Sequence, residues 1–539
     1  MAKPKTPNQK RKYGELNKRL AKYVMLVESI YEDLNLEAAK IVGITDFAID
    51  SDKPFMWSNY PQTRKRIRDL QERFVEDIGA VIYSGTSEEW KNSNEVQDLL
   101  ANKVLQTYVA TIGKEKYEIL YQPNNDALKA FQQRKDKGFT ISDKLWNQST
   151  LYKQELEEAI SCAIQKGTSA ITLSKQISKY LLDFPQLQKD YKERFGKASR
   201  AMDCEYRSIR LAASEINMAY RQAENLRWQQ MDFVVGYEIK LSNNHTCNGK
   251  PFQDICDILA GKYPKDFQWT GWHPLCRCYK IPILKTEEEF WEWDGRSEAT
   301  TASVNEVKDV PDAFKKWVLD NQERISTAKK RNTLPYFLRD NKSVYQKITV
   351  ESSISEIVKR ASSVGDEVQS IAERIAIKNG GYVTPINFKS TTSITRKVIT
   401  EGITPYDIKD AVRTTIIVPK SRIEDVLEEM YKTEGFLRLK RQKPESFMGY
   451  SGNIVNIRTT NGLTAEIQVN TERMIFAKER PEDAKRILGK KRWEEIHNET
   501  GMEGGLGHKY YEQWRILDKS SNEALKIVEK SIEYYSHFR

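Results

Sequence analysis

Apolar residues recur at every third or fourth position through most of residues 10–230, where Gly and Pro are rare. This is the period of an amphipathic helix, so we expect the first half of the chain to be mainly α-helical. The pattern changes over residues 241–282, which contain Asn-Asn, Asn-Gly, four prolines and a group of Cys and His residues. That composition predicts a small, loop-rich element. Residues 286–345 show little periodicity, which predicts a linker with some helix.

From about residue 350 the pattern predicts a second kind of domain. Apolar residues between 354 and 375 fall on one helical face, which Asn379-Gly380-Gly381 closes. Alternating or β-branched runs predict three strands, at 411–418, 453–459 and 463–470. A last helix is expected over 519–536. Helices and strands without regular βαβ repetition indicate an α+β domain. The predicted fold class is therefore multidomain, with a mainly α N-terminal half, a small Cys/His-rich loop element and an α+β C-terminal domain.

Composition adds a basic N-terminal arm to this picture. The 539 residues exceed what one core holds, and 39% hydrophobic with 30% charged residues describes a folded, soluble protein. The net charge is +10, and residues 1–24 supply most of it, with eight Lys or Arg against Glu15. Such an arm could contact nucleic acid or an acidic protein surface, or form a solvated leader helix. No apolar core follows these charges, so neither a signal peptide nor a membrane span is expected, and the default compartment is cytosolic.

The loop-rich element carries four of the six cysteines. Its potential metal ligands are His245, Cys247, Cys256, His273, Cys276 and Cys278. Zinc takes four tetrahedral ligands and prefers thiolates and imidazoles. The spacing is irregular, which leaves two interpretations open. The residues form either a zinc site or a knot of buried thiols with a hydrogen-bonded histidine.

Residues 150–285 carry a family resemblance in three segments, LAASEINMAYRQAENLRWQQ, HTC and WHPLCRC. Together they resemble the phage Mu F-like minor head proteins, the head morphogenesis family. Lys250 stands where that family has a second Cys, and Cys256 is the candidate substitute in a zinc set of Cys247, Cys256, His273, Cys276 and Cys278. The resemblance implies a minor protein of the phage head, located in the virion and contacting portal and head proteins. Residues 1–149 would then be a helical region with the basic arm.

A second set of polar residues follows the linker. Lys389, Ser393 and Lys397 are spaced by four residues, which suits contacts to successive phosphates. Asp410 opens one predicted strand and Glu466 lies on another, so adjacent strands would bring both carboxylates to one magnesium ion. Cations on phosphates beside a metal are the core of phosphoryl or pyrophosphoryl transfer. Glu466 could also deprotonate an attacking hydroxyl group.

Tyr450, beside Gly449, could stack on a nucleotide base. Each of these residues also has an ordinary interpretation, as a solvated helix face, a turn residue or the polar side of a half-buried strand.

One check concerns the strand over 463–470. A two-residue Asn461-Gly462 turn would place Glu466 opposite Ile457 and give a mixed face, so a uniformly polar face requires a longer loop.

The combination resembles the RelA/SpoT synthetases, the nucleotidyltransferase-like enzymes that make alarmones such as guanosine tetraphosphate. The resemblance covers about 350–515, within a domain expected at 346–539. It rests on five segments, INFKSTTSITRK, DAVRTTIIV, GYSGN, EIQVNTERM and GHKYYEQWR. It implies an ATP-dependent pyrophosphokinase of the toxin type that uses magnesium.

The resemblance also assigns roles to individual residues. The ATP phosphates would be held by Lys389, Ser393, Arg396 and Lys397. Magnesium would be held by Asp410 and Glu466, the catalytic pair; Tyr450 would stack on the acceptor base, and Gln468 and His508 would complete the site. The chain departs from the family at Asn387, Thr415 and Ile454, where Arg, Arg and His are usual. These departures favour toxin-like relatives, whose acceptors include adenine nucleotides and the tRNA 3′ end as well as guanine nucleotides.

Three functional hypotheses follow from the sequence. The first is a phage head protein whose C-terminal domain transfers pyrophosphate in the bacterial host cytoplasm and is neutralised by an antitoxin. The second is a purely structural head protein with an inactive synthetase-like domain. The third is a metal-dependent nuclease that uses the basic arm and the Cys/His cluster.

Overall fold

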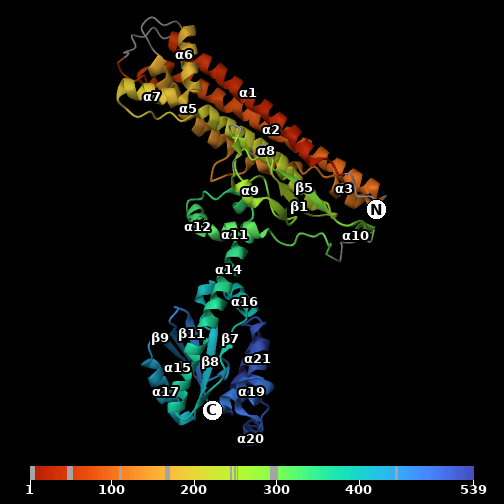
Figure 1. Ribbon diagram of the computed structural model, residues 1–539, viewed down its shortest axis with the longest axis vertical. Coiled ribbons are helices and arrows are strands. Elements are labelled where there is room, and N and C mark those ends of the chain that lie inside the picture. The colour runs from red at the N-terminus through yellow and green to blue at the C-terminus, as the bar shows by residue number, and fades with distance from the viewer. Residues whose placement is uncertain are drawn as a thin grey trace. The chain divides into compact units, whose positions relative to one another are not determined.

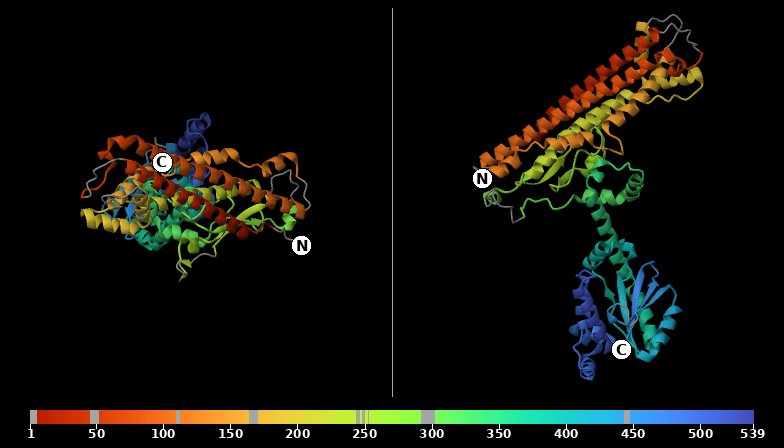
Figure 2. Two further views of the ribbon diagram at one scale, coloured as in Figure 1. Left: turned by 90° about the horizontal axis from the view of Figure 1, so that it is seen from above. Right: turned by 180° about the vertical axis from the view of Figure 1, so that it is seen from behind.

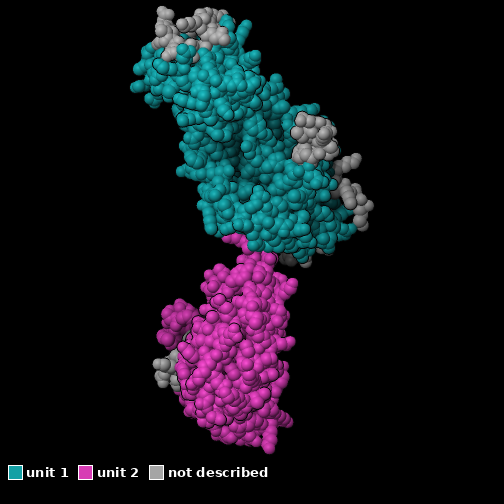
Figure 3. Space-filling view, turned by 60° about the vertical axis from the view of Figure 1, so that its left-hand side comes forward, with its two compact units in different colours: residues 1–345 teal, residues 346–539 magenta. Residues whose placement is uncertain are grey.

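The structure is a computed structural model that describes residues 6–44, 52–108, 112–163, 170–242, 246–247, 250–251, 253–291, 302–442 and 447–539. The chain forms two compact units, residues 1–345 and 346–539 (Figure 3). Across the described ranges, every helix is too short or too polar to cross a bilayer. The chain is mainly helical with a sheet-containing C-terminal region, as its hydrophobic pattern predicts.

Unit 1 begins with a bundle of long helices (Figure 1). These are α1 (Gln9–Ile44), α2 (Arg64–Thr107), α3 (Lys114–Leu120), α4 (Asn125–Gln133), α5 (Ile141–Ala163), α6 (Ala170–Leu182), α7 (Phe184–Phe195) and α8 (Cys204–Gln230). The helices α1, α2, α5 and α8 run alongside one another and bury a continuous apolar core (Figures 1 and 2). The bundle therefore buries the apolar stripes that the three-to-four period produces.

A small sheet packs beside α8, with strand order β4-β1-β5 and antiparallel pairing. The elements of this region are β1 (Val234–Lys240), β2 (Thr246–Cys247), β3 (Lys250–Pro251), α9 (Ile255–Leu259), β4 (Gly261–Tyr263), β5 (Tyr279–Leu284) and α10 (Glu287–Trp291). Three short helices complete unit 1, namely α11 (Asp312–Asp320), α12 (Gln322–Lys330) and α13 (Tyr336–Arg339). The described part of the segment expected as a linker, residues 286–345, thus contains α10, α11, α12, α13 and the first residues of α14.

The apolar face over 354–375 belongs to two helices, whereas the sequence predicted one. The helix α14 (Lys342–Ser363) ends before Val364, and α15 (Gly365–Lys378) follows at once. Gly365 permits the break because a Cβ there would lie 2.6 Å from Cζ of Phe388. The glycine therefore lets the β7 segment approach the start of α15.

The rest of unit 2 is a sheet with helices on both sides. Its strands are β6 (Tyr382–Val383), β7 (Asn387–Phe388), β8 (Val412–Ile417), β9 (Phe436–Arg441), β10 (Asn453–Arg458) and β11 (Thr464–Asn470). Its helices are α16 (Thr391–Glu401), α17 (Ile423–Tyr431), α18 (Glu472–Lys478), α19 (Pro481–Leu488), α20 (Lys490–Thr500), α21 (Leu506–Arg515) and α22 (Asn522–Ser536). The strand order is β6-β8-β11-β10-β9, with β7 also paired to β8 and only β8 and β11 parallel.

The two faces of this sheet differ in character. Alternate residues such as Val412, Val455 and Ile467 join the apolar core with α15 and α17. The opposite face carries Arg413, Asn456 and the other polar positions of these strands, and the C-terminal helices lie on that side (Figure 2). A polar face between a sheet and a helical layer is where a cleft for a charged ligand can form.

Candidate active site

The loop between β10 and β11 decides which residues face Glu466. Arg458 pairs with Thr464, so five residues connect the strands and Glu466 lies opposite Asn456. The two-residue turn, with Glu466 opposite Ile457, was therefore the wrong expectation. Thr459 closes the longer loop, because its backbone N–H and its hydroxyl group both donate to the carbonyl of Leu463, each at 2.9 Å. The longer loop therefore places Asn456 and not Ile457 beside Glu466, on a mainly polar face that also carries Ile454 opposite Gln468.

Asp410 lies between two lysines at the start of β8. Its Oδ2 atom is 2.5 Å from Nζ of Lys389, and its Oδ1 atom is 3.1 Å from Nζ of Lys397. Lys389 directly follows β7, and its backbone N–H donates to the carbonyl of Ala411 at 2.9 Å. Burial alone would raise the pKa of the Asp410 carboxyl group, but Lys389 and then Lys397 lower it below the ordinary value. The carboxylate is thus held ionised between cations.

Ser390 and Ser393 shape the first turn of α16. The Oγ atom of Ser390 accepts a hydrogen bond from the backbone N–H of Ser393 at 3.2 Å and caps the helix. The Ser390 hydroxyl group also donates to Oγ of Ser393 at 3.0 Å. Lys397 follows one turn later on the same face. The four-residue spacing therefore brings Lys397 and Ser393 to one side of the helix, beside Asp410.

A cleft of about 500 Å³ opens at this point. Its lining includes the predicted residues Lys389, Ser393, Arg396, Lys397 and Asp410, together with Arg413, Tyr511 and Arg515, which the sequence analysis did not single out. Cations thus predominate over acidic residues in its lining, which suits a polyphosphate.

Arg413 is the most informative residue that the sequence analysis missed. Its Cα pairs with that of Glu466 across the parallel β8–β11 ladder, and its side chain is exposed in the cleft. Among the residues that the structure describes, the guanidinium groups of Arg413 and Arg396 have no hydrogen-bond or ion-pair partner. The alternation of the β8 sequence places Arg413 on the polar face but does not identify the neighbouring strand.

A hydrogen-bonded chain leads away from Glu466 along the same face. The side-chain amide of Gln468 donates to Oε1 of Glu466 at 2.7 Å, and Nζ of Lys478 donates to Oε1 of Gln468 at 2.8 Å. Lys478 also forms an ion pair with Glu479 at 3.0 Å. Burial would raise the pKa of Glu479, but Lys478, Arg413 and His508 lower it. His508, on α21, therefore lies in the same electrostatic neighbourhood as the Glu466 strand.

Tyr450 lies against the C-terminal end of β11. Its hydroxyl group donates to Oδ1 of Asn470 at 3.0 Å, and its ring lies 5.5 Å from Nζ of Lys478. Gly452 allows this position, because a Cβ there would lie 2.1 Å from the Tyr450 oxygen. The ring also contacts Tyr535 of α22 edge-on. Tyr450 and the Lys389 cleft therefore lie toward opposite ends of the same polar face, and stacking on a base stays a prediction.

The carboxylates of Asp410 and Glu466 fit magnesium by donor chemistry. Both are oxygen donors, and they lie at the starts of neighbouring parallel strands beside a cationic cleft. Magnesium held by these two carboxylates would neutralise phosphate charge.

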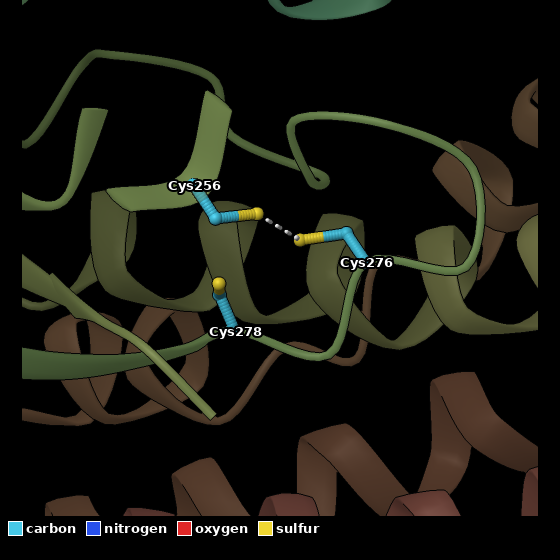
Figure 4. A group of neighbouring side chains, drawn as sticks. All are labelled: Cys256, Cys276 and Cys278. Atoms are coloured by element: carbon cyan, nitrogen blue, oxygen red, sulfur yellow. Dashed lines mark hydrogen bonds between the residues drawn. The ribbon is translucent and has the colours of Figure 1, made fainter. Parts of the chain in front are cut away.

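In unit 1, the other predicted site residues divide into two groups. Cys256, Cys276 and Cys278 are buried, and their sulfur atoms lie within 4.8 Å of one another (Figure 4). His273 lies next to Cys256, with Nε2 3.1 Å from its Sγ atom. Cys247 belongs to β2, but its side chain, like His245, lies outside the described residues.

No family model matches the chain. Over 181 residues the chain is 35% identical to the (p)ppApp synthetase toxin Tas1 of Pseudomonas aeruginosa (strain UCBPP-PA14), a match that covers 33% of this chain and 41% of Tas1. The chain therefore spans about two fifths of the length of that relative.

Two solved structures are also similar. One is the crystal structure of the complex between the Type VI effector Tas1 and its immunity protein, with 35% identity over 35% of this chain and 97% of that chain and a TM-score of 0.33. The other is small alarmone synthetase 1 from Bacillus subtilis, with 16% identity over 34% of this chain and 92% of that chain and a TM-score of 0.21.

The 35% identity over 181 residues relates part of this chain to the synthetase toxins. The chain contains a RelA/SpoT-like synthetase domain. Within that class, the domain is of the Tas1 type.

Proposed function

We propose that unit 2 transfers the pyrophosphate group of ATP to a ribose hydroxyl group of a nucleotide. The observation that carries this proposal is the placement of Asp410 between Lys389 and Lys397 in a cationic cleft, beside the strand that bears Glu466. A carboxylate held ionised among cations, with further unpaired guanidinium groups nearby, suits a triphosphate and a divalent metal ion.

The cleft residues would first position ATP. Lys389 and Lys397 pair with Asp410, and when Asp410 and Glu466 hold magnesium, both ammonium groups would be available to the phosphates. Arg396 and Arg413 are positioned to donate bidentate hydrogen bonds to phosphate oxygens. Positioning and charge neutralisation supply most of the rate enhancement in phosphoryl transfer, so these four cations would carry much of it.

Glu466 would then act on the acceptor. Its carboxylate takes the proton of the ribose hydroxyl group as the oxygen forms a bond to the β-phosphorus of ATP. The bond from that phosphorus to the oxygen bridging the α-phosphate breaks, and AMP leaves with the bonding electron pair. Gln468 holds Glu466 in place from the same strand, and Tyr450 would bind the acceptor base by stacking.

We propose an adenine nucleotide as the acceptor, because the Tas1 relative is a (p)ppApp synthetase toxin. Guanine nucleotides and the tRNA 3′ end are the competing acceptors. Tas1 was crystallised with its immunity protein, so we also propose that a small protein partner neutralises this chain. Free activity would arrest the growth of a host cell by consuming ATP.

Product analysis tests the reaction. The full chain is incubated with magnesium, γ-labelled ATP and one acceptor at a time, and the products are identified by chromatography and mass spectrometry. A labelled adenine product that Asp410→Asn and Glu466→Gln both abolish supports the proposal. Product with only GDP, GTP or tRNA overturns the acceptor but keeps the reaction. A wild-type chain that is silent with every acceptor overturns the enzyme and favours an inactive, structural domain.

We further propose that unit 1 is a phage minor head protein and that the chain travels in the virion to the bacterial cytoplasm. Its support is that two of the three segments that resemble the head morphogenesis family pack on each other. Arg221 of α8 donates to the carbonyls of Thr270, Cys276 and Cys278, at 3.0, 2.7 and 2.8 Å. Mass spectrometry of purified particles tests this location, and particles that lack the chain would contradict it.

A further inference from the structure

The Cys/His cluster of unit 1 has the dimensions of a metal site. The sulfur atoms of Cys256 and Cys276 are 3.8 Å apart, and that of Cys278 lies within 4.8 Å of both (Figure 4). Two thiolates bound at 2.3 Å to one tetrahedral zinc ion are separated by about 3.8 Å. A disulfide would bring the sulfur atoms to about 2.05 Å, and all three residues are free cysteines. The spacing is therefore that of two ligands of one ion.

His273 presents the atom that such an ion would bind. Its Nδ1 atom lies 2.7 Å from the carbonyl oxygen of Pro274, which can only accept, so Nδ1 carries the hydrogen. With Nδ1 as the donor, Nε2 is the ring nitrogen available to a metal ion, and it lies 3.1 Å from Sγ of Cys256. Asp254 is also near, with Oδ2 3.3 Å from the same nitrogen. A histidine oriented by a backbone carbonyl is the usual arrangement of a metal ligand.

The surrounding backbone holds these groups in place. Cys256 lies in the first turn of α9, whose N-terminus Asp254 caps through the backbone N–H of Cys256 at 2.7 Å. Cys276 and Cys278 lie just before β5, and hydrogen bonds from side chains of α8 hold their backbone in place. The buried Arg221 donates to both of their carbonyls, and Asn217 donates to that of Cys276 at 2.9 Å. The ligands therefore come from two segments that meet over one buried helix.

We propose that unit 1 binds one structural zinc ion through Cys256, Cys276, Cys278 and His273. Lys250 stands where a second Cys is expected before α9, and Cys256 supplies that thiolate instead. Four protein ligands close the coordination sphere, so the ion cross-links α9 to the segment that leads into β5 and leaves no position for a reacting water. This site does not suit the nuclease hypothesis, because metal-assisted hydrolysis needs an open coordination position.

The first measurement is the zinc content of the purified full chain, by mass spectrometry of the metal. All variants carry Glu466→Ala, so that expression does not depend on the chemistry of unit 2. We expect about one zinc per chain, and a fall to below about a tenth for Cys256→Ser, Cys276→Ser and Cys278→Ser. Cys162→Ser and Cys204→Ser are the matched controls, since both are buried cysteines of unit 1 outside the cluster, and they should keep the metal.

Cobalt exchanged into the unsubstituted protein gives a test that does not require a ligand variant to fold. Tetrahedral sulfur coordination produces thiolate-to-cobalt bands in the near ultraviolet and intense visible bands. Their presence supports the site, and their absence in a folded, zinc-free chain overturns it. If His273→Ala keeps the full zinc content and Cys247→Ser loses it, Cys247 is the fourth ligand and the assignment of His273 is wrong. Zinc content is independent of pyrophosphate transfer, so either proposal can fail without the other.

Discussion

Two groups of charged residues in this protein differ in how their charges are satisfied. In unit 1, Lys280 and Glu224 are fully buried and form an ion pair at 3.2 Å, and Tyr13 donates to Glu224 at 2.6 Å. In the cleft of unit 2, Arg396 and Arg413 are exposed and their guanidinium groups have no partner among the described residues. Buried charges require such pairing, because removing an unpaired ion from water is costly. Unpaired charges in an open cleft instead mark where a charged ligand binds.

Asp410 lies between these two extremes. It is mostly buried and paired with two lysines, yet it lines the open cleft. An ion pair that a ligand can replace therefore differs from a structural ion pair in its access to solvent, and not in the distance between its charged groups. Substitutions in the buried pair of unit 1 should then change stability and not pyrophosphate transfer, and substitutions of the unpaired cleft arginines should change activity with little change in stability.

The largest effect is expected for Glu466→Gln. This change keeps the size of the side chain and an acceptor oxygen for Gln468, but removes the base and one metal ligand. Pyrophosphate transfer should fall about 10³-fold, or about 4 kcal/mol in activation free energy, with no loss of unfolding free energy. Glu424→Gln is the control, since Glu424 pairs with Arg441 on the surface of the same unit. A variant that keeps most of its activity would remove Glu466 from the catalytic role.

The second-largest effect is expected for the buried Lys280–Glu224 ion pair of unit 1. Lys280→Met should lower the unfolding free energy of unit 1 by about 3 kcal/mol, because it leaves the Glu224 carboxylate buried without its cation. Pyrophosphate transfer by unit 2 should not change. Chemical denaturation followed by tryptophan fluorescence measures the loss, since Lys280 lies 4.6 Å from the ring of Trp228.

A double variant sharpens this result. Adding Glu224→Leu to Lys280→Met should recover much of the lost stability, because replacing both ions removes the unpaired charge. Lys316→Met, an exposed lysine of α11, is the control and should be neutral. Equal losses in the single and double variants would show that packing, and not charge pairing, is what Lys280 contributes.

The third-largest effect is expected for Arg413→Ala. It removes an unpaired guanidinium group that lies next to Glu466 across the ladder. We expect kcat to fall about 10²-fold, or about 2.7 kcal/mol, with little change in stability, because the charge would act on the transferring phosphates. Arg413→Lys should be intermediate, since an ammonium group lacks the bidentate geometry. Arg422→Ala, an exposed arginine paired with Asp425, is the control. An Arg413→Ala enzyme with wild-type kcat would contradict the proposed contact.

The sequence predicts the cleft residues that lie close to one another along the chain, because their grouping depends only on short-range spacing. Ser393 and Lys397 are one helical turn apart on α16, Lys389 lies just before that helix, and Asp410 precedes the strand that β7 joins, so the sequence pattern alone groups them. Arg413 and Lys478 could not be found in this way. Arg413 meets Glu466 only because β11 crosses over to pair in parallel with β8, and Lys478 meets Gln468 only because α18 folds back over the sheet.

The predicted helix over 354–375 was wrong for a related reason. Its apolar period continues through Val364, but the first helix ends at Ser363, and Phe388, from a distant segment, lies against Gly365, where the second helix begins. The apolar period shows which face of a helix is buried, but it does not show which segment packs against that face. The long-range partner therefore decides where an element breaks, which strands are neighbours and which polar residues share a cleft.

The smallest expected effect is the pH dependence of the Asp410 pair. Burial raises the pKa of this carboxyl group, but Lys389 and Lys397 lower it below its ordinary value of 3.8. The folded state therefore binds this proton less tightly than the unfolded state, so the pair stabilises unit 2 above that value and ceases to do so as the pH falls through the folded pKa.

The matched variant isolates this contribution, because Asp410→Asn keeps the shape and loses the charge. Near pH 6, without magnesium, the wild type should exceed Asp410→Asn by about 1 kcal/mol in the unfolding free energy of unit 2. The difference should shrink as the pH falls below 3.8. Urea denaturation over a pH series measures it. A difference that is constant with pH would show that Asp410 contributes shape and not charge, and Asp410 would then resemble neither the buried pair of unit 1 nor a ligand-exchangeable carboxylate.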